Sequence, residues 1–178
     1  MVAGVDVDAE IELLDRVGLD VAASTENLRL VRLLVAAFGT SHGADVDDLE
    51  DLRIATDDLC AHLMTQAAAG SRLAVEAVTM RRDADPAVRI GVRAEIERTG
   101  SVAELDQIAA LIIGAAADTF GLIHRPANAR ATWCVRPDGD GDGIELDAAP
   151  AEAEAPPALL TAWFCRRLGG QSGSDDHG

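Results

Sequence analysis

Between Val88 and Ile96 the sequence alternates strictly, with apolar side chains at every second position and Arg, Gly or Glu between them. A period of two places these apolar side chains on one face of a strand, so we expect a sheet with a buried face here. The segment from Arg72 to Met80 also reads as a half-buried strand, and Arg-Arg-Asp-Ala-Asp-Pro supplies a turn between the two. The pair therefore predicts antiparallel strands that need a covering layer.

Two segments before these strands have the spacing of amphipathic helices. The first begins after Ser24 or Thr25, either of which suits a cap, and is expected to end at Gly39. The second opens at Asp45 with several acidic residues, which favour the positive end of the helix dipole, and runs to about Gln66. The expected buried stripes are Leu28, Val31, Val35 and Phe38 in the first helix, and Leu49, Leu52, Thr56, Leu59 and Leu63 in the second.

Further elements are predicted on either side of this central region. A short helix is expected around Glu10 to Val17. After the strands, Ser101 with Glu104 forms a capping box, which predicts a helix that ends near Gly121 and is the most buried of all. Its stripe is Leu105, Ile108, Leu111, Ile112 and Ala115.

The C-terminal third is expected to contain a hairpin, a linker and one more helix. Residues 131 to 136 alternate, and residues 138 to 143 turn the chain into Ile144 and Leu146. Residues 148 to 156 resemble a linker in composition, residues 157 to 168 predict a short helix, and residues 171 to 178 predict disorder. Trp163 and Phe164 lie in that helix and are expected to dock onto the body. The fold class is α+β, a two-layer sandwich with helices on one face of a mainly antiparallel sheet.

Composition excludes several classes of function. The chain has 178 residues, a formal net charge of −16, no Lys and no Tyr, which removes P-loop lysines, Schiff-base lysines and tyrosine nucleophiles. The negative net charge argues against direct nucleic-acid binding. Acidic residues concentrate in residues 1 to 60 and 137 to 178, which indicates either a basic protein partner or solubility alone. We expect a cytoplasmic protein, because neither a signal peptide nor a membrane-spanning apolar run is visible.

Three groups of residues are candidates for chemistry. Asp58 and His62 stand four apart on one helix face, as a base beside a metal or phosphate ligand or as an ordinary surface pair. The run Asp138 to Gly143 begins like a calcium loop, but Ala149 occupies the position of its bidentate Glu, so a hairpin turn is expected. Cys60 has no basic neighbour to activate it and is interpreted as an inert buried thiol.

The segment Asp51-Leu-Arg-Ile-Ala-Thr-Asp-Asp-Leu-Cys-Ala-His-Leu63 resembles the helix motif of ATP-binding anti-sigma factors of the serine-kinase type (RsbW-like). Residues 19 to 38 are similar to that family's first strand and helix, which turns Leu19 to Ala22 into a short strand. The resemblance implies a histidine-kinase-like (GHKL) ATPase fold. It also divides the chain into an acidic N-terminal segment at 1 to 17, the domain at 18 to 148, and a tail at 149 to 178.

The same resemblance implies a function. Such proteins bind a sigma factor, are released by an anti-anti-sigma partner of the STAS type, commonly dimerise, and in their kinase members phosphorylate a serine of that partner with Mg-ATP. Asp58 falls at the family's catalytic base, a Glu, and His62 at its magnesium-binding Asn. Glu97 and Gly100 fall loosely at its Asp-x-Gly-x-Gly nucleotide motif, of which one glycine is present.

These departures make partner binding with a degenerate ATP site the leading interpretation. Asp58 is one methylene shorter than Glu, and His62 is a poor ligand for the hard magnesium ion. Two alternatives stay open. One is an active serine kinase that uses Asp58 as base, and the other is a catalytically dead dimerisation scaffold.

Overall fold

The computed structural model describes residues 11–83, 85–98, 104–126, 129–135, 141–146 and 158–169. Its helices are the 3₁₀ turn η1 (Thr25–Asn27), α1 (Leu28–Ser41), α2 (Val46–Thr65) and α3 (Gln107–Ala116). Its strands are β1 (Ile11–Ala22), β2 (Arg72–Arg82), β3 (Asp85–Arg98), β4 (Thr119–Pro126), β5 (Ala131–Val135), β6 (Asp142–Leu146) and β7 (Ala158–Arg167).

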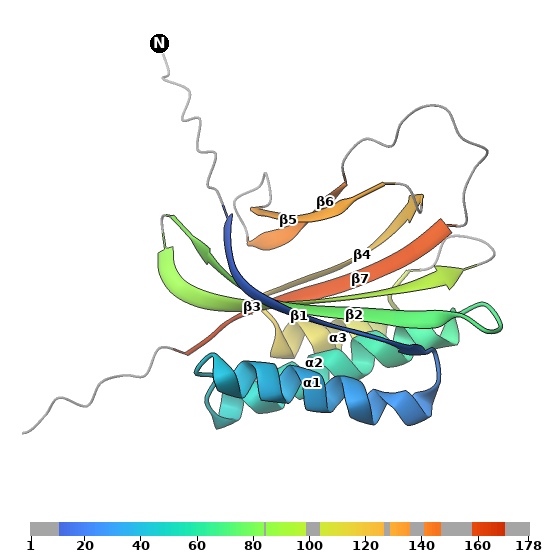
Figure 1. The fold of residues 1–178 in the computed structure, drawn as a ribbon, viewed down its shortest axis with the longest axis horizontal. Helices are drawn as coiled ribbons and strands as arrows, with labels where there is room; N and C mark the ends of the chain where they lie inside the picture. The colour runs from blue at the N-terminus through green and yellow to red at the C-terminus, as the bar shows by residue number, and fades with distance from the viewer. Residues whose placement is uncertain are drawn as a thin grey trace, which may run out of the picture.

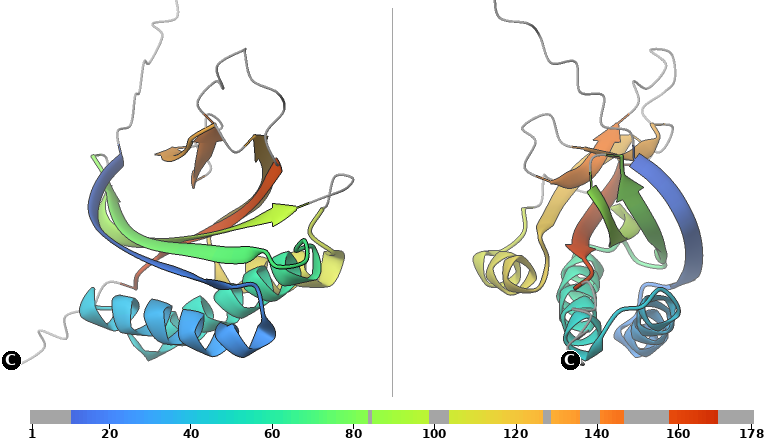
Figure 2. Two further views of the ribbon diagram at one scale, coloured as in Figure 1. Left: turned by 45° about the vertical axis from the view of Figure 1, so that its right-hand side comes forward. Right: turned by 90° about the vertical axis from the view of Figure 1, so that its left-hand side faces the viewer.

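Five of the strands form one twisted antiparallel sheet in the order β1-β2-β3-β7-β4. The three α-helices cover one face of this sheet, and the two-stranded sheet β5-β6 lies over the other face (Figure 1). Within the helix layer, α2 contacts both α1 and α3 (Figure 2). The predicted α+β sandwich, with its helices on one face of an antiparallel sheet, is therefore confirmed.

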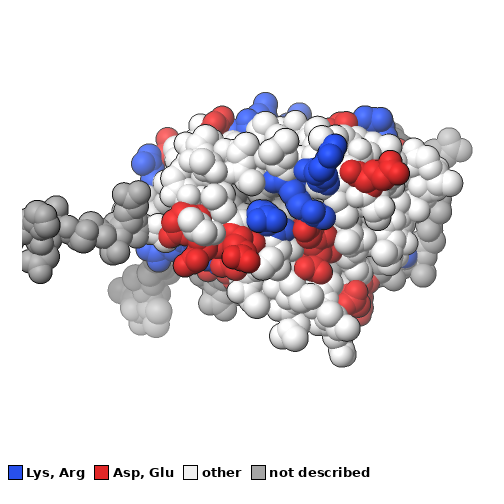
Figure 3. Space-filling view, turned by 90° about the horizontal axis from the view of Figure 1, so that it is seen from below, with Lys and Arg blue, Asp and Glu red and all other residues white. Residues whose placement is uncertain are grey.

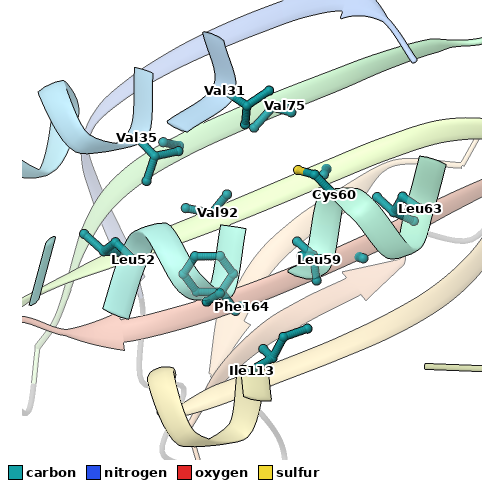
Figure 4. Close-up of a cluster of buried hydrophobic side chains, with 14 of the residues drawn as sticks. Val31, Val35, Leu52, Leu59, Cys60, Leu63, Val75, Val92, Ile113 and Phe164 are labelled. Atoms are coloured by element: carbon teal, nitrogen blue, oxygen red, sulfur yellow. The ribbon is translucent and has the colours of Figure 1, made fainter. Parts of the chain in front are cut away.

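The main core lies between the helices and the sheet (Figure 4). The stripe predicted for the first helix is buried in full, and in α2 the predicted Leu52, Thr56, Leu59 and Leu63 are buried. From the sheet, β3 turns Ile90, Val92, Ala94 and Ile96 toward them, as its alternation predicts. The predictions for the first helix stripe and for the central strands are confirmed, and that for α2 is confirmed except at Leu49, which is half-buried.

A smaller apolar cluster lies on the opposite face of the sheet. Trp133 of β5 packs against Val78, Met80 and Trp163, and its ring meets that of Trp163 edge to face at a centroid distance of 6.2 Å. The predicted hairpin of residues 131 to 146 thus exists as β5-β6, and it covers sheet surface rather than extending the main sheet.

The helix predicted at Glu10 to Val17 is wrong, because β1 covers residues 11 to 22 and pairs with β2 along its whole length. Leu19 to Ala22, which the family resemblance makes a strand, is the end of β1. As an edge strand with most of its side chains exposed, β1 has no strong apolar alternation to reveal it.

The end of α1 and the whole of α3 also differ from expectation. Helix α1 continues past Gly39 to Ser41, and Gly39 is instead a packing site, since a Cβ there would lie 3.0 Å from Leu49 Cδ2. Helix α3 begins at Gln107 and ends at Ala116, with Gly121 already in β4, while Ser101 lies outside the described residues.

The face that α3 buries is not the predicted one. Small side chains and one Ile are buried, namely Ala109, Ile113 and Ala116. Ile108 is 72% exposed and Leu111 is 75% exposed. The expectation that this helix is the most buried is therefore wrong. A wholly apolar run carries no period that says which of its faces turns inward.

The helix predicted for residues 157 to 168 is wrong as well, because residues 158 to 167 form the interior strand β7, between β3 and β4. It alternates Leu160, Ala162 and Phe164 toward the helices with Trp163 and Cys165 toward the second cluster. Burial on both faces removes the polar alternation that identifies a strand. Trp163 and Phe164 are both buried, which confirms that they dock onto the body. The sheet thus extends beyond residues 18 to 148 at both ends, while residues 147 to 157, including the expected linker, and 170 to 178 lie outside the described residues.

Candidate functional site

A pocket of about 640 Å³ lies where the C-terminal half of α2 meets the N-terminus of α3. Helix α2 contributes Asp58 and His62, which its period places on one face, as predicted. The remaining lining residues are Ala61 and Thr65 from α2, and Asp106, Gln107, Ile108 and Ala109 at the start of α3. The two predicted residues therefore share one site.

His62 is buried, with 8% of its surface exposed. Its Nδ1 lies 3.5 Å from Asp106 Oδ2, a long contact across the two helices, so the pair predicted with Asp58 is formed with Asp106 instead. In the tautomer that donates from Nδ1 to this carboxylate, Nε2 carries a lone pair and is an acceptor. Within the described part of the chain, Nε2 is buried and has no hydrogen-bond partner.

Asp106 holds the start of α3. Its Oδ1 accepts hydrogen bonds from the backbone N–H groups of Ala109 (2.8 Å) and Ile108 (2.9 Å). The pKa of the Asp106 carboxyl is lowered below its ordinary value. The largest cause is the hydrogen bond from Ala109 N–H, and His62 is a smaller cause. Sequence reasoning missed Asp106, although an acidic residue directly before the apolar run from Gln107 is a typical cap signal.

Asp58 differs from Asp106 in the direction of its pKa shift. Partial burial, and then the charges of Asp57 and Asp106, raise the pKa of Asp58 above its ordinary value. Asp57 next to it is ion-paired with Arg32 of α1, whereas no ion pair to Asp58 is found within the described residues. The pocket thus contains one carboxylate that is stabilised by hydrogen bonds and one that lacks a counter-ion.

The other two predicted site residues are not part of this pocket as described. Glu97 is an exposed residue of β3, and its carbonyl accepts hydrogen bonds from Ala68 N–H (3.3 Å) and Ser71 Oγ–H (3.1 Å). Its backbone therefore fastens the turn after α2. Gly100 lies outside the described residues.

The residues that line the pocket do not fit Mg-ATP. Apart from the imidazole of His62, none of those described is basic, whereas a triphosphate needs positive groups or free backbone N–H donors. In the first turn of α3, the N–H groups of Ile108 and Ala109 are already taken by Asp106 Oδ1. Magnesium prefers oxygen ligands to an imidazole, and within the described ranges no group of three His, Cys, Asp or Glu side chains is placed to hold a metal ion.

Two further sequence candidates have structural roles. Asp142, in the run read as the start of a calcium loop, is buried and paired with Arg82 (2.6 Å) and Arg89 (3.2 Å), while residues 138–140 of that run lie outside the described residues. Cys60 is fully buried, and burial raises its pKa to about 12, which confirms the inert thiol. Across the described residues, no helix is long and apolar enough to cross a membrane.

Known proteins similar to this chain were found by sequence and by structure. The anti-sigma-F factors RsbW of two Mycobacterium tuberculosis strains, CDC 1551/Oshkosh and H37Rv, are each 43% identical over 70 residues. Each match covers 39% of this chain and 38% of the relative, so the chain matches well under half of these relatives' length. The resemblance to RsbW-like anti-sigma factors is thereby confirmed over that segment. No family model matches.

One solved structure was also similar in fold. A crystal structure of the RsbU and RsbW domains of a Mycobacterium tuberculosis protein is 17% identical to the chain, with a TM-score of 0.48. The match covers 87% of this chain and 33% of that one. That likeness is too distant to bear on the site.

Proposed function

We propose that the chain is an anti-sigma factor-like regulatory protein of the cytoplasm. It sequesters a sigma factor, a STAS-type anti-anti-sigma partner releases it, and its nucleotide site is degenerate. The sequence match to RsbW supports the anti-sigma role. The observation that carries the degenerate nucleotide site is the pocket itself, where Asp58 and His62 stand in place of the family's Glu and Asn and none of the described lining residues is Arg.

The helix-bearing face is the surface that we propose for partner binding. The charges of the first 60 residues suggest a uniformly acidic face, but this face is mixed. Arg side chains gather near its middle, with groups of Asp and Glu around them (Figure 3). Arg29 of α1 and Arg53 of α2 are exposed. A mixed pattern of charge favours a specific partner over general attraction to basic proteins.

A pull-down of the tagged chain from lysate of its native host tests the proposal, with mass spectrometry of the bound proteins. We expect recovery of a sigma factor in the absence of nucleotide, with no change when Mg-ATP is added. Recovery of only this chain or a close homologue would contradict the proposal and favour a dimerisation scaffold.

The active serine kinase is the second candidate, and one observation favours it. Asp58 lines the pocket, and its raised pKa brings it nearer to the range of a general base. Mixing the chain with a recovered STAS partner and radiolabelled ATP at millimolar Mg-ATP decides between the two. We expect no transfer of label. Transfer by the natural chain that Asp58→Ala abolishes would establish the kinase and overturn the degenerate site.

A further inference from the structure

We infer that the pocket between α2 and α3 takes the guanidinium group of an arginine side chain from a partner protein. This inference rests on the proposed function, because it identifies the chemistry of a partner at the site that the family resemblance assigns to Mg-ATP. It is carried by three features of the pocket, namely two carboxylates with no Arg among the described lining residues, a buried imidazole nitrogen without a partner in the described part of the chain, and exposed apolar surface at its edge.

The carboxylates make the pocket a site for a cation. Asp58 and Asp106 both line it. The nearby Arg32 is already engaged by Asp57, and within the described chain nothing basic pairs with Asp58. Burial, then the charge of Asp57 and then that of Asp106 make Asp58 costly to ionise, as the raised pKa of this carboxyl reflects. A cation between the two carboxylates of the pocket lowers that cost, whereas a phosphate increases it.

His62 supplies the second and independent observation. Its side chain is more than nine-tenths buried, it lines the pocket, and its Nε2 has no partner within the described residues. A buried acceptor without a donor is unfavourable, so a ligand that brings an N–H group gains more than it would from the carboxylates alone. Nε2 and the two carboxylates can all accept hydrogen bonds, so they match a ligand group that only donates them.

The guanidinium group fits this set of acceptors better than other cations. Arginine presents five N–H donors in a planar fork and no acceptor, so one group can serve both carboxylates and an imidazole nitrogen. Magnesium is excluded by the imidazole, and an ammonium group has only three donors around one point. Asp106 keeps its Oδ1 on the helix N-terminus and therefore offers Oδ2 to the ligand.

The apolar rim indicates that the arginine belongs to a protein. Ala61, Ile108 and Ala109 line the pocket and suit the methylene stem of an arginine. Ile108 is 72% exposed, and Leu111 one turn further along α3 is 75% exposed. Ile108 at the pocket and Leu111 further along α3 expose apolar surface that a free amine would leave in water and that a protein partner can cover.

The test uses the full chain labelled with nitrogen-15 and titrated with N-acetyl-arginine amide, observed by two-dimensional NMR. We expect shifts concentrated at residues 58–65 and 106–109, weak binding, and no response to N-acetyl-citrulline amide, which has the same shape without the charge. Asp58→Asn is expected to weaken binding about tenfold through loss of a charged hydrogen bond. Glu50→Gln, which removes the same charge from an exposed position of α2, is the matched control and should bind as the natural chain does.

Asp106→Asn is the second variant, because Asn keeps the cap of α3 and removes only the charge that faces His62. This variant too is expected to bind the arginine probe more weakly than the natural chain does. Equal shifts with the citrulline probe, shifts confined to other residues, or unchanged binding by both variants would overturn the inference. Mg-ATP that shifts the pocket residues while the arginine probe does not would also overturn it. The NMR titration and the pull-down have separate outcomes. If a sigma factor is recovered but the arginine probe does not bind, this inference alone is overturned. If the probe binds but no sigma factor is recovered, the proposed function alone is overturned.

Discussion

Arg166 Nε lies 3.1 Å from Asp48 Oδ1, so the last strand of the sheet is ion-paired to the first turn of α2. Asp48 is 2% exposed, and its Oδ2 accepts a hydrogen bond from Gly169 N–H at 3.0 Å. Arg166 also reaches Asp51 at 2.7 Å. One buried carboxylate therefore holds the C-terminal strand against the helix layer.

Asp48→Ala is expected to lower the free energy of unfolding by about 3 kcal/mol, because it leaves a largely buried guanidinium with only Asp51 to pair with. Urea denaturation followed by circular dichroism measures this. Asp47→Ala removes an exposed acid from the same helical turn and should cost less than about 1 kcal/mol. Similar losses in the two variants would contradict the role given to Asp48.

A chain that ends at residue 157 is expected not to fold cooperatively. It lacks β7, which supplies Leu160, Ala162 and Phe164 to the core and the hydrogen-bond partners of both β3 and β4. Without it the sheet has two buried, unpaired strand edges. Thermal unfolding by circular dichroism should show no transition, whereas a chain that ends at residue 169 keeps every described element and should unfold as the full chain does. A cooperative transition in the shorter chain would show that β7 is dispensable.

Gly121→Ala is expected to cost about 1–3 kcal/mol of stability through overpacking. A Cβ at this position of β4 would lie 2.8 Å from Trp163 Cζ2, and the indole is itself buried between the sheet and the hairpin. Gly18→Ala in β1 is the control, since the nearest atom to its Cβ is Val75 O at an ordinary 3.7 Å. Urea midpoints should fall for the first variant and not for the second, and the same comparison by tryptophan fluorescence reports on Trp163 directly.

The two carboxylates of the pocket are expected to affect stability with opposite dependence on pH. The pKa of Asp58 is raised on folding, so ionisation of this carboxyl opposes folding. The loss of stability is absent at a pH below the ordinary pKa of 3.8 and develops as the pH rises through the folded pKa. Asp58→Asn should therefore gain stability relative to the natural chain between about pH 3 and about pH 7.

Asp106→Asn should show the reverse. The pKa of Asp106 is lowered on folding, so its contribution is present above the ordinary value of 3.8 and is lost as the pH falls through the folded pKa. The variant should lose stability relative to the natural chain as the pH rises. Melting temperatures of the three proteins across that range measure both slopes. Slopes of the same sign would contradict the electrostatic account of the pocket.

How much of the fold was predictable depended on whether a segment buries one face or two. The stripe from Leu28 to Phe38 and the alternation from Val88 to Ile96 each have one buried face, so their period is visible in the sequence. The strand β7 is buried on both faces and was read as a helix, and β1 is an edge strand with little burial on either face. The run in α3 was apolar throughout, so its sequence gave no basis for choosing between Ala109 and Ile108 as the inward side.

The candidate site divides in the same way. That Asp58 and His62 share a face of one helix follows from a spacing of four, which is local and was predicted. That His62 meets Asp106 rather than Asp58 depends on where α3 begins and on how it packs against α2. No periodicity encodes a contact between two helices that are separated by the whole of β2 and β3.

The sequence alone determined the α+β class, the helix faces, the central strands and the family resemblance, because each rests on residues close together in the chain. Only the tertiary structure decided that β7 completes the sheet, that two apolar side chains of α3 stay exposed, and that a buried imidazole lines the same pocket as two carboxylates. The physical reason is that a side chain becomes buried only when another surface packs against it. A segment shows which side chains it has to bury, and the packing of distant segments selects which of them are buried and against what.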